Sequence, residues 1–195
     1  MKAHSINKQN NFINGWYTNQ NNCKNLIKYF EDNINKTVRG TVNRNNKATI
    51  DKNYKESTDL HCNINDDSKI LQKYFKENLK PSVDAYINNY KYSSELHQGW
   101  SICPSFNIQK YLPNEGFKAY HFERDLNTVL RHLVFTTYLN NVEDNGETEF
   151  YHQKIKIKPE QGLTVIFPAD WTFTHRGIVS KTQTKYIITG WFAYN

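Results

Sequence analysis

Cysteine, methionine, proline and glycine are all scarce in this chain of 195 residues, which has three cysteines, one methionine, five prolines and eight glycines. The three cysteines, Cys23, Cys62 and Cys103, are an odd number and lack the paired spacing of a structural metal site. Neither a disulfide framework nor a zinc finger is therefore expected. We interpret these residues as free thiols, which favours a reducing compartment and predicts a cytoplasmic location.

Long hydrophobic runs are also missing. No run approaches the length needed to cross a bilayer, and the first residues, MKAHSINKQNNF, lack the apolar centre of a secretory signal, so no membrane association is expected. The net charge is +6, but the lysines are spread along the chain, which favours a solvated basic surface over a nucleic-acid partner. Aromatic residues make up 14% of the chain. That content speaks against disorder and predicts a single domain over residues 1–195.

The spacing of apolar residues changes near residue 100. Before it, two stretches have the period of a helix, and the face of the first is formed by Cys23, Leu26, Ile27, Phe30 and Ile34. A second helix is expected over residues 67–79. Pro81 should interrupt that helix before it resumes over residues 83–90. The region 1–100 is thus predicted to be a helical support.

After residue 100 the period shortens to two, and turn-forming residues separate short segments. Strands are expected at Phe106–Tyr111, Ala119–Glu123, Leu130–Leu139, Glu149–Tyr151, Lys154–Ile157, Leu163–Phe167, Thr172–His175 and Lys185–Tyr194. Many short strands at this spacing indicate a sandwich or barrel. The predicted fold class is α+β, mainly β: a double-stranded β-helix of jelly-roll or cupin-like type over residues 101–195, supported by the N-terminal helices.

A possible metal site begins with His121 and Glu123, which form an H-x-E motif in one expected strand. Residues i and i+2 of a strand point to the same face, so the imidazole and the carboxylate project together. With one more histidine they would form the two-His, one-carboxylate face of non-haem Fe(II) oxygenases, which leaves three coordination positions open. Asp125 lies on the same face, but it follows the expected end of the strand. Glu123 is therefore the favoured carboxylate.

The third ligand must come from further along the chain, where His132, His152 and His175 are the candidates. His132 lies in an alternating strand, and His152 lies beside an expected turn. His175 follows the apolar strand Leu163–Phe167 and precedes Lys185 by ten residues. An H-x-E tripeptide alone is weak evidence, because a surface histidine beside a surface glutamate is common.

Residues 107–191 as a whole resemble the Fe(II)/2-oxoglutarate-dependent dioxygenases of the prolyl 4-hydroxylase type, and most closely their small microbial and phage-borne members. The matching elements follow the family's order and spacing: Tyr111-Leu112-Pro113, His121-Phe122-Glu123, Arg131, Tyr138-Leu139-Asn140, Gly146-Glu147-Thr148-Glu149-Phe150, Phe167-Pro168, His175 and Lys185-Tyr186 through Trp191. The resemblance implies that His175 completes the metal site. A phage-borne member would act in the cytoplasm of its host.

The resemblance also implies the cofactors and the pocket residues. Fe(II), 2-oxoglutarate and O2 would be required, with ascorbate as a possible reductant. Lys185 matches the basic residue that holds the far carboxylate of 2-oxoglutarate, a charge-assisted bond. Tyr138, Tyr111 and Thr148 match residues that line the co-substrate pocket. Arg131 and Trp191 match residues near the primary substrate.

Two departures from the family pattern concern the metal and the substrate. Well-known prolyl hydroxylases carry H-x-D, whereas this chain has Glu123, which is one methylene longer but still supplies an oxygen ligand. No peptide-binding module is recognisable in the N-terminal region. Hydroxylation of a peptidyl proline or another protein side chain is the leading hypothesis, and a free amino acid or small metabolite is the alternative substrate.

Three other functions compete with this interpretation. A zinc hydrolase also uses two histidines and a glutamate, but its H-E-x-x-H helix motif is absent. A nucleic-acid dioxygenase of the same superfamily would show two arginines after the distal histidine, and here Arg176 stands alone. A non-catalytic cupin-like binding module would form no succinate in the presence of iron and 2-oxoglutarate.

Overall fold

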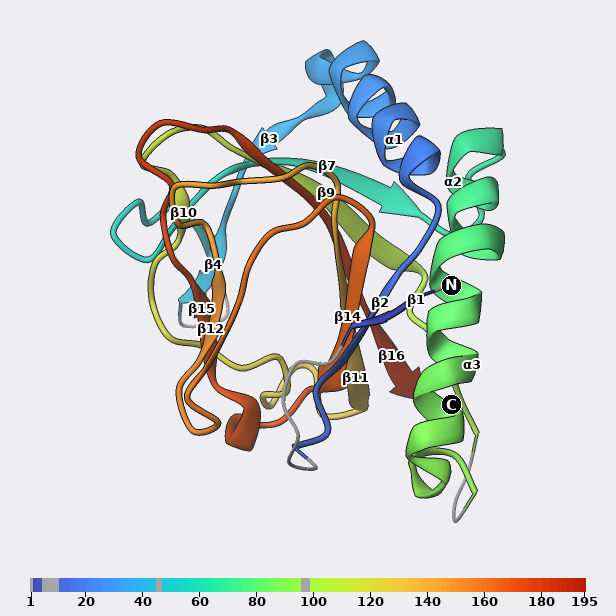
Figure 1. Cartoon of the computed structure of the whole chain (residues 1–195). Coiled ribbons are helices and arrows are strands. Elements are labelled where there is room, and N and C mark those ends of the chain that lie inside the picture. The colour runs from blue at the N-terminus through green and yellow to red at the C-terminus, as the bar shows by residue number, and fades with distance from the viewer. Residues whose placement is uncertain (1, 5–10, 45–46, 96–98) are drawn as a thin grey trace.

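The computed structural model describes residues 2–4, 11–44, 47–95 and 99–195, and its central element is one large antiparallel sheet (Figure 1). Within the described residues this sheet has nine strands, in the order β1-β2-β14-β11-β16-β9-β7-β3, with β8 paired to β16. Their bounds are β1 Lys2–His4, β2 Asn14–Tyr17, β14 Leu163–Pro168, β11 Arg131–Tyr138, β16 Lys185–Tyr194, β9 Ser105–Tyr111, β7 Thr58–Asn63, β3 Val38–Arg39 and β8 Trp100–Ile102.

Smaller sheets lie across from the large sheet and form the opposite wall of a barrel (Figure 1). They have the orders β13-β12-β15, β10-β6 and β4-β5. Their bounds are β12 Thr148–Phe150, β13 Ile155–Ile157, β15 His175–Gly177, β10 Gly116–Phe117, β6 Lys55–Glu56, β4 Val42–Arg44 and β5 Lys47–Thr49. The fold is mainly β with a double-stranded β-helix core, as the sequence predicted.

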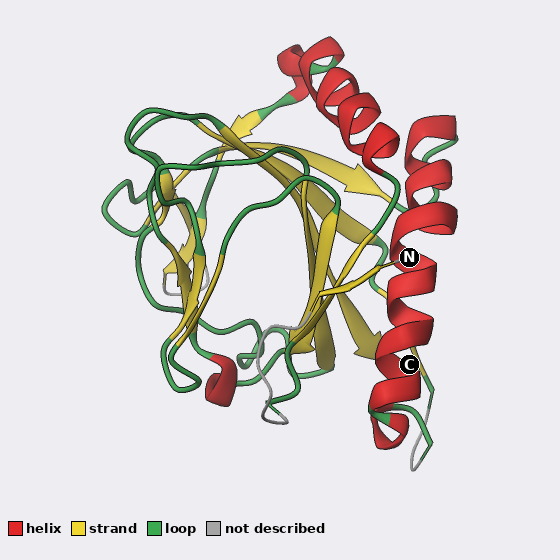
Figure 2. Cartoon of the chain, in the orientation of Figure 1, coloured by secondary structure: helices red, strands yellow, loops and turns green. Residues whose placement is uncertain are grey.

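The helices cover the outer face of the large sheet (Figure 2). They are α1 Gln20–Asp32, α2 Lys69–Tyr74 and α3 Lys80–Asn89, with short helical turns η1 Ile34–Lys36, η2 Phe75–Leu79, η3 Lys91–Ser93 and η4 Trp171–Phe173. Side chains of a strand point alternately to its two faces. Each central strand therefore sends one set of residues into the helix layer and the other set into the barrel.

The first helix follows its expected apolar face with one exception. Asn19 caps α1 through its side chain, which accepts a hydrogen bond from the backbone of Asn21. Leu26 and Phe30 are fully buried against the sheet. Ile34, expected on the same face, is 47% exposed, because α1 ends at Asp32 and Ile34 begins the separate turn η1. That assignment was wrong.

The expected interruption at Pro81 was also wrong, because the helical path continues from α2 through α3. A proline in a helix removes one hydrogen bond and crowds the carbonyl four residues earlier. Here the five residues before Lys80, Phe75–Leu79, form a π-helical turn, and Pro81 falls in the first turn of α3. A widened turn at this point lets the chain pass the ring without ending the helix.

Two of the expected strands are absent. Residues 119–123 form only an isolated bridge between His121 and His175. The bridge does not extend into a strand, because the backbone N–H of Glu123 bonds to the carbonyl of Ala169. The segment expected as the strand Thr172–His175 begins instead within the turn η4, where the side chain of Asp170 accepts a hydrogen bond from the backbone N–H of Thr172. The strand β15 begins only at His175. The last strand, β16, has the predicted bounds.

The region before residue 100 supplies strands as well as helices. β2 pairs with β14, and β7 pairs with β9, so both join the large sheet on either side of its centre. β3 extends the same sheet beyond β7. Among the described residues, no helix has the length and apolar character required to cross a membrane.

Because Leu26 is 0% exposed beneath α1, we expect Leu26→Ala to lower the free energy of unfolding by about 2–5 kcal/mol, through lost burial and the cavity that remains. Leu126 is 93% exposed, so Leu126→Ala should change it by about 0.5 kcal/mol or less. Chemical denaturation of both variants measures the difference. Equal losses would show that α1 is not part of the core.

Candidate active site

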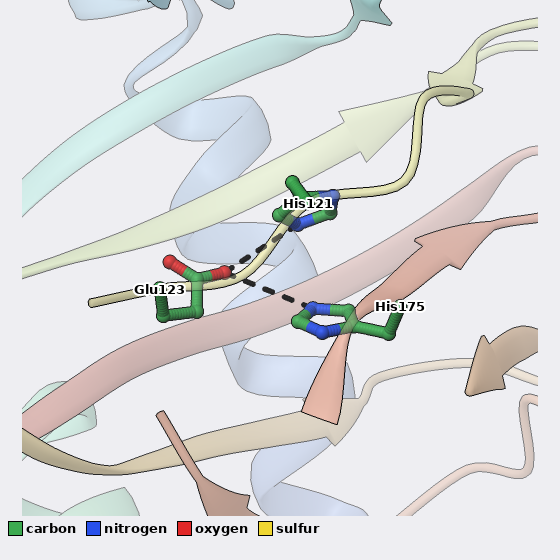
Figure 3. A group of neighbouring side chains, drawn as sticks. All are labelled: His121, Glu123 and His175. Carbon is green, nitrogen blue, oxygen red and sulfur yellow. Dashed lines mark ion pairs between the residues drawn. The ribbon is translucent and has the colours of Figure 1, made fainter. Parts of the chain in front are cut away.

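Three side chains, those of His121, Glu123 and His175, bring their ligand atoms within 4.8 Å of one another (Figure 3). The Nε2 atoms of His121 and His175 lie 3.5 and 3.7 Å from the same atom, Oε1 of Glu123. The bridge between the two histidine backbones holds the two segments together. The other candidates from the sequence lie outside this cluster: Asp125, His132 and His152.

Backbone carbonyls fix the orientation of both imidazole rings. Nδ1 of His121 lies 3.1 Å from the carbonyl oxygen of Ala119, and Nδ1 of His175 lies 2.9 Å from that of Phe173. A carbonyl only accepts, so each Nδ1 carries the hydrogen and each Nε2 presents a lone pair. When both rings are neutral, two lone pairs and a carboxylate oxygen converge with no hydrogen between them. This arrangement is unfavourable by itself and fits a cation.

The protonation states suit a divalent metal. Burial and the neighbouring His121 lower the pKa of His175 to about 4, so this imidazole is neutral at pH 7. Burial opposes ionisation of Glu123, but the hydrogen bond with His121 and the charges of His121, His175 and Arg131 outweigh it and lower the pKa of Glu123 to about 2. Neutral imidazole and ionised carboxylate are the forms that bind metal.

The second oxygen of Glu123 is also held. Trp191 donates a hydrogen bond from Nε1 to Oε2 of Glu123 at 2.9 Å, and a guanidinium nitrogen of Arg131 lies 3.3 Å from the same oxygen. The Arg131 guanidinium stacks on the Trp191 ring at 3.7 Å. Both residues line the cavity, and both orient the carboxylate of Glu123.

Phe117 supports the site from β10, and sequence reasoning missed it. Its ring stacks on the imidazole of His121, with 3.5 Å between ring centres and 7° between the planes. The stack limits rotation of His121 about its side-chain bonds. Nothing in the sequence pointed to this contact, because β10 has only two residues and lacks a readable period.

A cavity of about 450 Å³ extends from these residues into the barrel, and all four predicted co-substrate residues line it. Lys185 is buried and donates a hydrogen bond from Nζ to the carbonyl of Gly146 at 2.9 Å. Among the described residues it forms no ion pair within 4.0 Å. Burial lowers the pKa of Lys185 to about 8, although the charge of Glu147 opposes the shift. The ammonium therefore remains mostly charged at pH 7 and has hydrogens available for an anion.

The hydroxyl groups around Lys185 have defined directions. Tyr138 donates to Oγ1 of Thr148 at 2.6 Å, which leaves the Thr148 hydrogen free for another acceptor. Tyr111 donates to Oε1 of Gln109 at 2.7 Å, so its hydrogen is already used. Its ring lies 5.0 Å from the Lys185 ammonium. Lys185 and Thr148 are therefore the donors, and Tyr111 contributes an aromatic wall.

The direction of Gln109 is set by a buried ion pair that the sequence did not reveal. Gln109 donates from Nε2 to Oδ2 of Asp59 at 3.1 Å, and Lys55 donates to the same oxygen at 2.7 Å. Both Asp59 and Lys55 are buried. They come from β7 and β6, in the half of the chain where no site residue was expected.

Comparisons with known proteins agree with this geometry. The profile described as 2OG-Fe(II) oxygenase superfamily matches residues 106–193. The chain is similar to this superfamily over that segment, which makes up 88 of its 195 residues. A search of curated protein sequences finds no match. The family match coincides with the segment that carries His121, Glu123, His175 and Lys185.

Solved structures share the fold at low identity. A viral collagen prolyl hydroxylase from Paramecium Bursaria Chlorella virus-1, in complex with 2OG, has a TM-score of 0.68 and 16% identity over 94% of this chain and 97% of that one. A Pseudomonas putida prolyl-4-hydroxylase has a TM-score of 0.69 and 12% identity over 94% and 93%. A Trichoplax adhaerens prolyl hydroxylase with a hypoxia inducible factor peptide has a TM-score of 0.73 and 14% identity over 94% and 84%.

The chain is therefore a 2-oxoglutarate/Fe(II)-dependent dioxygenase with a fold like that of prolyl 4-hydroxylases. Its cofactors are Fe(II), 2-oxoglutarate and O2. The two-His, one-carboxylate donor set fits that metal. The zinc-hydrolase and non-catalytic interpretations do not account for the family match.

If His121, Glu123 and His175 hold the metal, anaerobic titration should find one Fe(II) site per chain. His121→Ala and His175→Ala should each weaken Fe(II) binding by more than the roughly 10–100-fold typical of losing an outer-shell partner. His152→Ala changes an exposed histidine outside the cluster and should leave binding unchanged. Parent-like affinity in both of the first two variants would reject the ligand set.

We expect the dissociation constant for 2-oxoglutarate to depend on the charge of Lys185. Because the pKa of Lys185 is about 8, the constant should be nearly flat below pH 8 and should rise above it by up to about tenfold per pH unit. Lys185→Ala should raise it about tenfold or more at pH 7, since a charge-assisted bond is lost. Anaerobic calorimetric titration of the iron-loaded protein measures both effects.

Lys185→Arg is the matched control, because a guanidinium stays protonated over this range. It should remove the rise above pH 8. If Lys185→Arg shows the same pH dependence as the parent, another group is responsible for the titration. Unchanged Fe(II) affinity in Lys185→Ala would show that the substitution affects 2-oxoglutarate binding and not metal binding.

Proposed function

We propose that this oxygenase hydroxylates an amino-acid side chain within a peptide or protein, with proline as the leading candidate, and that His121, Glu123 and His175 hold its iron. One observation carries the proposal. Three metal-binding groups converge on the wall of a cavity, and the buried ammonium group of Lys185, which has no ion-pair partner among the described residues, lines the same cavity. A metal-chelating dianion would join the metal to the ammonium group.

The residues of the chain then have distinct tasks. Lys185 and Thr148 bind the far carboxylate of 2-oxoglutarate by charge and hydrogen bonding. Fe(II) and 2-oxoglutarate, when bound with O2, supply the oxidation of a substrate C–H bond to C–OH, with release of succinate and CO2. Apolar side chains exclude water from the space between, which strengthens the electrostatic contacts there: Val134, Phe150, Ile157, Val165, Phe167 and Ile187.

The open side of the cavity suits an extended substrate. Polar residues of the loop after Glu123, Asp125 and Thr128 among them, line the rim, and Leu126 and Val129 of the same loop expose apolar surface beside it. The segment Thr41–Arg44 lines the cavity as well. These surfaces extend well beyond the metal and would contact residues on either side of the modified one. The similar structures include a viral collagen prolyl hydroxylase and a prolyl hydroxylase in complex with a peptide fragment, which supports the same substrate class here.

A free amino acid is the alternative substrate, and Arg131, the cation in contact with Glu123, would be the group nearest the metal ligands to hold its carboxylate. That guanidinium is already bonded to the carboxylate and the backbone carbonyl of Glu123 and stacked on Trp191. The geometry therefore favours a peptide. We also propose a cytoplasmic location, supported by Cys23, Cys62 and Cys103, which are free thiols in the structure.

Incubation of the iron-loaded enzyme with 2-oxoglutarate, O2, ascorbate and proline-containing peptides should give succinate and a peptide heavier by one oxygen atom. Free L-proline under the same conditions should remain unmodified. Mass spectrometry of both reactions decides between the substrate classes. Oxygen incorporation into the free amino acid alone would overturn the peptide proposal and leave the oxygenase chemistry intact.

A further inference from the structure

Four polar side chains form one row across the inner face of the large sheet. In the register of the sheet, His61 of β7 is opposite Asn107 of β9, Asn107 is opposite Thr189 of β16, and Thr189 is opposite Thr136 of β11. All four line the active-site cavity. Two residues along β16 from Thr189 lies Trp191, which bonds to Glu123. The row therefore runs beside the proposed iron site.

The fold does not account for this polarity. On the opposite face, the same strands contribute apolar residues to the core under the helices, such as Leu60, Phe106 and Ile188. In the neighbouring inner row, Asp59 and Gln109 are buried, and they bond to each other and to Lys55 and Tyr111. The row of His61 and Asn107 differs because His61 is exposed, so that its hydrogen-bonding groups are accessible from the open part of the cavity.

The unused groups are a donor and an acceptor on adjacent strands. Nδ1 of His61 lies 2.6 Å from Oδ1 of Asn107, so the imidazole donates from Nδ1 and presents Nε2 as an acceptor. The amide nitrogen of Asn107 has no hydrogen-bond partner among the described residues. By contrast, Thr189 donates to the carbonyl of Phe135, and its oxygen lies 3.1 Å from that of Thr136. The threonine pair has therefore used its hydrogens.

We propose that Asn107 and His61 form a subsite for the backbone of the peptide substrate beside the hydroxylated residue. The amide nitrogen of Asn107 donates to a substrate carbonyl, and Nε2 of His61 accepts a substrate N–H. A secondary amide offers this combination of acceptor and donor, whereas a carboxylate has no hydrogen for Nε2. The inference rests on the proposed function, because it assumes a peptide substrate.

The position of the row separates this subsite from the co-substrate pocket. Lys185 and Thr189 belong to the same strand, but His61 lies two strands away from β16, roughly 10 Å across the sheet. His61 is exposed, and the cavity continues from it to the segment Thr41–Arg44. A peptide entering along this side would reach the proposed iron without displacing 2-oxoglutarate from Lys185.

The test uses the full-length, iron-loaded enzyme and an N-acetylated, C-amidated Ala-Ala-Pro-Ala-Ala peptide. Asn107→Leu and His61→Phe should each raise the KM for the peptide about tenfold, as expected for a lost hydrogen bond in a partly desolvated site. The KM for 2-oxoglutarate, the peptide-independent rate of succinate formation and the thermal unfolding temperature should stay at parent values. Asn88→Leu, the same change at an exposed position of α3, should alter none of these.

Esters in place of single amides of the peptide remove one N–H at a time. One such replacement should raise the KM of the parent but not that of His61→Phe, which would assign the lost contact to His61. If the parent hydroxylates the peptide and both variants keep its KM, the subsite is wrong and the proposed function stands. If the parent forms no hydroxylated peptide while it oxidises another substrate, the proposed function itself fails.

Discussion

The active site depends on two backbone hydrogen bonds between segments far apart in the sequence. The N–H of His121 donates to the carbonyl of His175, and the N–H of His175 donates to that of His121, both at 2.9 Å. These two bonds fix the distance between the imidazoles, and the bond from the Glu123 N–H to Ala169 fixes the carboxylate. Because the barrel walls are rigid sheets, a short bridge between them is enough to hold three ligand atoms together.

Because the carboxylate ligand is Glu123 and not an aspartate, the neighbouring residues must restrain it more. A side chain longer by one methylene has one more rotatable bond, so its carboxylate needs more restraint to keep one orientation. Trp191 and Arg131 provide it by bonding to the oxygen that faces away from the histidines, and their mutual stacking holds them in turn. As a consequence, the guanidinium of Arg131 is less available to bind an anionic substrate. Substrate recognition must then come from elsewhere on the cavity wall.

The sequence predicted the parts of this site that follow a local rule. Residues two apart share a strand face, and that rule paired His121 with Glu123 even though only an isolated bridge forms there. The bounds of β16, which begins at Lys185, follow from a run rich in β-branched and aromatic residues. The family's order and spacing supplied His175. By contrast, Phe117 and the Lys55–Asp59 pair reach the cavity through sheet closure, which joins residues that no period relates. The π-helical turn before Pro81 was equally unpredictable, because it accommodates a single proline and follows no repeating sequence pattern.

The large sheet separates stability from function by its two faces. Its outer residues pack with α1, α2 and α3 into a continuous apolar core, where burial provides most of the free energy of folding. Its inner residues include the buried Lys185, Asp59 with its ion pair to Lys55, and a polar row, all of which cost free energy to remove from water. A small barrel could not stabilise such an interior by itself. The helical layer therefore does more than cover one face: its core offsets the cost of keeping Lys185 charged and the cavity open. Substitutions on the outer face should consequently alter stability with little effect on the cavity, while an apolar residue in place of the buried Lys185 should stabilise the fold as it weakens binding.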